Sequence, residues 1–350
     1  MDRRSFLLAG LAAPWMLRHA ARAGDERVPI GDMHAHLFFI GPNTPTSRPL
    51  ARTMAAGNAT LVAWSLVGDL PWLRRSSRGL KQKGAPQKGE PIDWFRAEIA
   101  RITAHIAEQG LKIVREPDDV DRALGGEPHV VLSVEGATFI ETDVGALRTA
   151  YDLGVRHLQL VHYIDNPLAD FQTAAPRHGG LSELGREVIA ECNRLGILID
   201  LAHASEEAVG QALALSKVPM VWSHGSVTRT AEPHWSMPAT RARRLTLASA
   251  KDIADKGGGV GLWTLRSDVG GTTEDYAKRL EQMADWLGED HAAFGTDMNA
   301  VANPPVKSYA DLQRVVGHWR RQGMAETRIR KLAIGNYARV LKQALSARSA

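Results

Sequence analysis

Cysteine is almost absent from this sequence of 350 residues. Because Cys192 is the only one, no disulfide can form within the chain, and stability has to come from packing or a bound metal. The sequence also lacks a large net charge of either sign. The formal net charge of +4 falls to about +1 without residues 1–23, which hold four arginines and one aspartate. A nearly neutral chain gives no electrostatic reason to expect nucleic acid or an anionic membrane as a partner.

A run long enough to cross a membrane is missing from the N-terminal segment. Its apolar stretch, Leu7–Leu17, is too short for a transmembrane helix. Arginines stand at positions 3 and 4, and Ala21-Arg22-Ala23 has the form of a cleavage site. The order RRSFL is similar to a twin-arginine export signal. We therefore predict a signal peptide over residues 1–23, one domain over residues 24–350, and a periplasmic or secreted protein without a lasting membrane anchor.

Apolar runs of strand length alternate with segments of helical periodicity. The runs cover residues 28–35, 59–67, 129–137, 155–163, 196–204, 218–225, 258–265 and 292–299. Segments 94–109, 185–195, 205–216 and 247–257 have apolar residues at three- and four-residue spacing. Eight such runs, several almost continuous in Val, Ile and Leu, predict an α/β fold of the (β/α)8 TIM-barrel type. The alternative is a doubly wound open sheet, but no glycine-rich phosphate loop follows an early strand.

Polar side chains recur at one position in these runs, at or just past the carboxyl end. The set comprises His34, His36, Glu135, His162, His203, His224 and Asp297. In a barrel that end is the active-site face, so the seven side chains should converge there. Buried ionisable groups are costly unless they are paired or bind a metal.

The spacing of the histidines indicates metal binding. Residues two apart on a strand face the same side, so His34 and His36 can bind one ion. His203 and His224 can bind a second, and Glu135 can bridge both. Zn²⁺ is the default ion for nitrogen-rich sites, although Co²⁺, Mn²⁺ or Ni²⁺ suit the same ligands. Two ions can share a water molecule and lower its pKa toward neutrality.

Several segments resemble the membrane dipeptidases, also called renal dipeptidases, which are zinc peptidases of the amidohydrolase-like barrels. The resemblance runs from about Ile30 to Leu341. Its motifs are VVLSVEGA with Glu135, LGVRHLQLVHYIDNPLAD with His162, GLSELGREVIAECNRLGILIDLAHAS with His203, VPMVWSHGS with His224, RARRLTLASAKDIADKGGGVGL with Arg243, FGTDMN with Asp297, and IGNYARVL.

The resemblance implies a metal-dependent dipeptidase in which a metal-bridging hydroxide attacks the scissile carbonyl. Glu135, His203 and His224 fall at the family's ligand positions, and together with the His34 and His36 pair inferred from strand spacing they would hold two zinc ions, with a single ion as the alternative. His162 would stabilise the oxyanion and contact the substrate, and Asp297 would move the proton to the leaving amine. Arg243 would bind the substrate carboxylate. The expected partner is thus a dipeptide or another small molecule, and a homodimer is left open.

The chain departs from the family in ways that keep other functions open. The family's first motif is D-x-H-x-D, whereas DMHAH puts His36 at the second aspartate, so Asp297 is an alternative ligand. Asn299 replaces a common acidic residue. The substrate is therefore a dipeptide or, alternatively, another amide, a lactam or a lactone. A barrel that binds peptide or metal without turnover is a third alternative. The basic run Arg74–Gly89 is interpreted as a solvated loop or, alternatively, a flap near the site.

Overall fold

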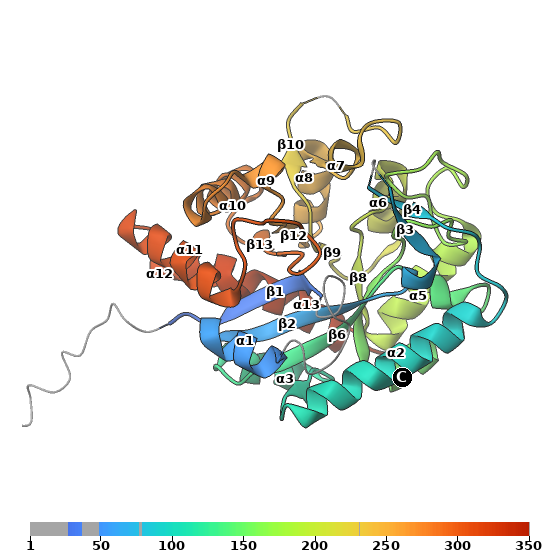
Figure 1. Ribbon diagram of the computed structural model, residues 1–350, viewed down its shortest axis with the longest axis horizontal. Coiled ribbons are helices and arrows are strands. Elements are labelled where there is room, and N and C mark those ends of the chain that lie inside the picture. Colours follow the sequence, from blue (N-terminus) through green and yellow to red (C-terminus); the bar gives the residue numbers. More distant parts are fainter. Residues whose placement is uncertain (1–26, 37–48, 77–78, 231, 350) are drawn as a thin grey trace, which may run out of the picture.

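The eight predicted strand segments form one parallel sheet that curls into a nearly closed barrel (Figure 1). The last strand returns to the first through a parallel bridge between Ala35 and Met298, where the His36 N–H donates to the Met298 carbonyl at 2.9 Å. The strands are β1 (Ile30–Ala35), β2 (Ala59–Val67), β6 (His129–Glu135), β7 (Val155–Gln159), β8 (Leu198–Asp200), β9 (Val221–Trp222), β12 (Gly259–Leu262) and β13 (Ala292–Phe294). The predicted barrel is confirmed.

The computed structural model describes residues 27–36, 49–76, 79–230 and 232–349. The predicted signal peptide lies outside these ranges. Within them, no helix is both long and apolar enough to cross a membrane. Short strands outside the barrel are β3 (Leu73–Ser76) paired with β4 (Gly79–Gln82), β10 (Val227–Thr228) paired with β11 (Leu245–Thr246), and β5 (Lys112–Ile113) beside β6.

Helices surround the strands (Figure 1). They are α1 (Leu50–Gly57), α2 (Glu90–Glu108), α3 (Pro117–Leu124), α4 (Ala146–Asp152), α5 (Glu183–Leu195), α6 (Glu206–Leu215), α7 (Ala239–Ala242), α8 (Leu247–Asp255), α9 (Arg266–Val269), α10 (Thr273–Leu287), α11 (Tyr309–Arg321), α12 (Glu326–Arg330) and α13 (Asn336–Ser346). Short turns are η2 (Leu70–Trp72), η3 (Thr138–Ile140) and the π-helical η4 (Lys331–Gly335). Ser182 and Ser205 cap α5 and α6 by accepting the N–H groups of Gly185 and Ala208.

Helix α13 closes the amino-terminal end of the barrel. The Asn336 side chain donates to the Ala292 carbonyl at the start of β13, at 2.7 Å. Apolar side chains of η4 and α13 form one cluster with strand residues such as Met33 and Leu61. The opposite end of the barrel therefore carries the predicted polar residues.

Two glycines let the strands approach closely beneath that face. A Cβ atom at Gly261 would lie 1.8 Å from the Ser223 carbonyl oxygen, and one at Gly295 would lie 1.7 Å from it. Any side chain at either position would push β12 and β13 away from the segment that carries His224. The close packing thus fixes where His224 enters the site.

Candidate active site

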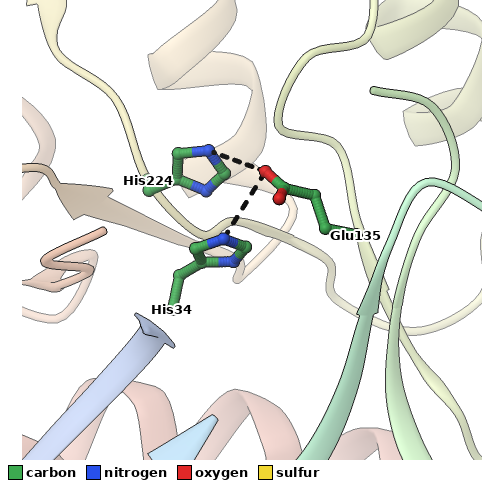
Figure 2. A group of neighbouring side chains, drawn as sticks. All are labelled: His34, Glu135 and His224. Carbon is green, nitrogen blue, oxygen red and sulfur yellow. Dashed lines mark ion pairs between the residues drawn. The ribbon is translucent and has the colours of Figure 1, made fainter. Parts of the chain in front are cut away.

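The Glu135 carboxylate lies at the centre of the carboxyl end of the barrel. It is the last residue of β6 and is 3% exposed. Five imidazoles direct Nε2 toward it: to Oε1 from His34 at 3.5 Å, His162 at 3.4 Å, His203 at 3.3 Å and His224 at 3.5 Å, and to Oε2 from His36 at 3.5 Å. Figure 2 shows His34 and His224 reaching the same carboxylate oxygen from separate segments. The predicted convergence is present.

Local backbone irregularities aim several of these side chains. Between the pairs Asp32 with Val62 and Ala35 with Trp64, β1 has one more residue than β2, which is a bulge. His203 and Asp297 have φ angles of 70° and 53°, a region that is costly for residues other than glycine. Asp297 Oδ1 consequently lies 3.4 Å from His36 Nε2. Strain of this kind is typical of functional sites.

Hydrogen bonds to the far ring nitrogens orient the imidazoles. Ser65 Oγ contacts His34 Nδ1 at 3.0 Å, and the Ser65 carbonyl contacts His36 Nδ1 at 3.0 Å. Ser223 Oγ contacts His224 Nδ1 at 2.9 Å. Metal-binding histidines are commonly held in this way, with Nδ1 engaged and Nε2 left for the ion.

The electrostatics favour a charged Glu135 carboxylate beside neutral imidazoles at His203 and His224. Burial alone would raise the pKa of Glu135, but the surrounding histidines outweigh it and hold that pKa well below its usual value. Burial, reinforced by the Arg243 guanidinium, keeps the pKa values of His203 and His224 well below the ordinary range. Neutral imidazole and ionised carboxylate are the forms that bind metals.

The donor set fits divalent metal ions. Three overlapping groups have ligand atoms within 4.8 Å of one another: His34, Glu135 and His224; His34, His36 and Asp297; and Glu135, His162 and His203. Imidazole nitrogens with carboxylate oxygens suit zinc and similar ions. The second group brings Asp297 beside His36, the arrangement expected if Asp297 is the alternative ligand.

The Glu135 cluster lines a cavity with a volume of about 230 Å³. Arg243 is buried and lines the same cavity. Its Nη1 donates to Gln172 Oε1, and its guanidinium carbon lies 5.5 Å from the Trp263 ring centre. Nε and Nη2 have no hydrogen-bond partner in the described part of the chain. Burial raises the pKa of Tyr163, which lines the cavity too, to about 12, so this hydroxyl remains a donor. The cavity therefore combines a cation with free donors and a metal-ligating cluster.

Asp69 is a site residue that the sequence analysis missed. Its Oδ1 lies 2.7 Å from His162 Nδ1, and its Oδ2 accepts the Tyr163 N–H at 3.1 Å. Asp69 follows β2 by two residues, so the pattern that singled out the other polar side chains also applied to it.

Asp268 was missed as well: it accepts the Trp263 indole N–H at 2.9 Å and forms an ion pair with Arg244 at 2.6 Å.

The interpretation of the basic run Arg74–Gly89 as a solvated loop holds for residues 83–89 and needs correction for the part before them. Leu73–Ser76 and Gly79–Gln82 pair as the antiparallel strands β3 and β4. Gly79 and Leu80 line the cavity that holds Arg243 and Glu135. The nearness to the site that the alternative, a flap, requires is therefore present in this hairpin.

The chain is similar in sequence to proteins of one known family. Residues 87–350 match the family model of the membrane dipeptidases, peptidase family M19. Dipeptidase verJ of Clonostachys rogersoniana is 32% identical over 176 residues, which are 49% of this chain and 43% of the relative. An uncharacterized dipeptidase of Schizosaccharomyces pombe is 31% identical over 240 residues, 64% of this chain and 54% of that protein. The chain thus spans about half the length of these two curated relatives.

A solved structure shares the fold. It is a metallopeptidase from Rhodobacter sphaeroides liganded with a phosphinate mimic of the dipeptide L-Ala-D-Ala. The two chains align with a TM-score of 0.76 and 22% identity, over 91% of this chain and 100% of the other.

Proposed function

The chain belongs to the membrane dipeptidase family, and from this membership we propose that it is a metal-dependent dipeptidase. The observation that supports the proposal most strongly is that one cavity contains both a candidate carboxylate-binding residue and candidate metal ligands. Arg243 offers unpartnered donors for a carboxylate, and the Glu135 cluster offers metal ligands on the same walls. A substrate held at its carboxylate by Arg243 would present its peptide bond to the cluster. The dipeptide mimic bound by the Rhodobacter sphaeroides relative supports this substrate class.

We propose zinc as the ion and two as the number of ions. His34, His36 and Glu135 would hold one, and His203, His224 and Glu135 the other, with Asp297 as a further ligand beside His36. Such ions, when bound, acidify water and polarise a carbonyl oxygen. Burial of these ligands places their charges in an environment less polar than bulk water, where electrostatic interactions with an ion are stronger.

His162 would stabilise the substrate carbonyl oxygen, and Asp297 would transfer a proton to the leaving amine. Asp69 engages Nδ1 of His162, so Nε2 is aimed at the centre of the cluster, where it would donate a hydrogen bond to the substrate carbonyl oxygen. Asp297 lies beside His36, at the cavity wall. From there its carboxylate would pass a proton to the departing amine.

We propose a periplasmic or secreted location, reached through the twin-arginine-like segment. The support is the arginine pair at positions 3 and 4, the short apolar stretch and the Ala21-Arg22-Ala23 site. A homodimer stays a prediction.

Hydrolysis assays on a dipeptide panel test the proposed function. Protein stripped with a chelator should lose turnover, and Zn²⁺ should restore it. His203→Ala and Asp297→Ala should abolish turnover, whereas His318→Ala, which changes a histidine on α11 outside the cluster, should retain it. Turnover that survives both chelation and Asp297→Ala would contradict the mechanism. Hydrolysis of lactams, lactones or other amides without dipeptide turnover would favour the alternative substrates, and metal binding without any turnover would favour a binding protein.

A further inference from the structure

A larger cavity adjoins the one that holds the site. The inner cavity has a volume of about 230 Å³ and the outer one about 910 Å³. Both are lined by Gly79 and Leu80 of β4 and by Ala239 and Thr240 of α7. The two cavities are therefore neighbours, and we name the larger one the outer cavity.

The walls of the outer cavity are mostly apolar. They come from three segments, residues 79–81, 173–175 and 235–240. Trp235 is 44% exposed and Met237 is 36% exposed, which is unusual for such large apolar side chains. No acidic side chain lines the cavity, and Lys81 is its one charged residue among those described. These walls suit an apolar group better than a charged one.

Helix α7 places the outer cavity beside the carboxylate-binding guanidinium. Ala239 and Thr240 precede Arg243 by four and three residues, a spacing that puts them on the same helical face. The residue whose carboxylate Arg243 would hold thus lies next to the opening of the outer cavity. That residue is the carboxy-terminal one of a dipeptide.

We propose that the outer cavity binds a large apolar side chain on the carboxy-terminal residue of the substrate. The inference rests on the proposed dipeptidase function and adds a substrate class to it. An aromatic side chain there would leave water and pack on Trp235, Met237 and Leu80, whereas an alanine methyl would not reach them. Apolar pockets discriminate by about tenfold or more between side chains of such different size.

Three substrates distinguish a preference at the carboxy-terminal residue of the dipeptide from one at the amino-terminal residue. We would measure kcat/KM for Ala-Phe, Ala-Ala and Phe-Ala, with the carboxy-terminal residue in the L and in the D configuration. The expected result is that Ala-Phe is cleaved about ten times more efficiently than Ala-Ala in at least one configuration, with no similar gain for Phe-Ala. Trp235→Ala should bring the ratio of Ala-Phe to Ala-Ala close to one, and Trp235→Phe should keep most of it.

Leu124→Ala is the matched control, because Leu124 is also a large apolar residue, 39% exposed, but lies on α3. It should keep the wild-type ratio. An unchanged ratio in Trp235→Ala, or a preference at the amino-terminal residue instead, overturns the inference and leaves the dipeptidase function standing. Absence of turnover for all three substrates, by contrast, counts against the proposed function itself. Circular dichroism of each variant separates these results from misfolding.

Discussion

Asp69 Oδ1 and His162 Nδ1 lie 2.7 Å apart in the interior of the site, where Asp69 is fully buried. Burial alone would lower the pKa of His162, but the Asp69 and Glu135 carboxylates outweigh it and raise that pKa. The contact also selects the ring orientation in which Nε2 faces Glu135, at 3.4 Å. Asp69 is therefore a positioning residue for His162.

Asp69→Asn should reduce kcat by about a hundredfold, because a neutral amide no longer stabilises positive charge on the His162 ring as the Asp69 carboxylate does. KM should change by less than about threefold, since Asp69 does not line the cavity near Arg243. Steady-state kinetics on one dipeptide, together with metal analysis of the variant, check this. Loss of metal, or a rise in KM that accounts for the whole effect, would show that Asp69 has a structural role instead.

Arg243→Lys should reduce kcat/KM by about a hundredfold, mostly through KM. A lysine keeps the charge but has no planar pair of donors for a carboxylate and cannot stack between Trp222 and Trp263. Arg241→Lys, two residues away and exposed, is the control and should change little. A dipeptide amide, which lacks the carboxylate, should be cleaved equally poorly by wild type and variant. A large further loss on the amide would mean that Arg243 acts elsewhere in the reaction.

The barrel could be predicted because its strands are buried on both faces. Each apolar run contained one strand, and the site histidines followed from their position at the strand ends. Strand lengths were overestimated: the run 218–225 holds only the two residues of β9. The rest of that run is loop, although Met220, Ser223 and His224 within it are buried. The hydrophobic pattern of a sequence indicates which residues are buried, whereas backbone hydrogen bonds determine where each strand begins and ends.

Features that depend on contacts between distant segments were beyond the sequence. The partner of Asp69 is a histidine 93 residues away, and a single acidic residue after a strand does not reveal that pairing. The pairing of β3 with β4 joins strands rich in Arg and Lys, with no apolar alternation to indicate them. The outer cavity likewise forms only when β4, the 173–175 segment and α7 come together.

His36→Asp should tighten binding of the second divalent ion by about tenfold or more. The substitution adds a negative charge among the ligands, and a closer charge balance favours a second cation. It also restores the aspartate of the D-x-H-x-D motif that the sequence otherwise resembles. His36→Asn, which removes the imidazole without adding charge, is the control. Metal content per chain after dialysis against a competing chelator should rise in the aspartate variant alone. Equal content in both variants would mean that site charge does not limit occupancy.

The Asp170 carboxylate organises the loop that supplies part of the outer cavity. It accepts the N–H groups of Arg177 at 2.6 Å, His178 at 2.9 Å and Gly180 at 2.8 Å. Burial would raise the pKa of Asp170, but these three donors outweigh it and lower that pKa. A carboxyl with a depressed folded-state pKa contributes stability that is present above its unfolded pKa and is lost as the pH falls through the folded value.

Asp170→Asn should therefore reduce the free energy of unfolding by about 1–3 kcal/mol near neutral pH. The difference from wild type should shrink as the pH falls below about 4, because the wild-type carboxyl then becomes protonated and loses its advantage over the amide. Denaturant titrations of both proteins across this range measure the difference. Asp93→Asn, whose side chain is 78% exposed, should show no such dependence. A difference that stays constant with pH would mean that the amide disturbs the packing of the loop rather than its charge.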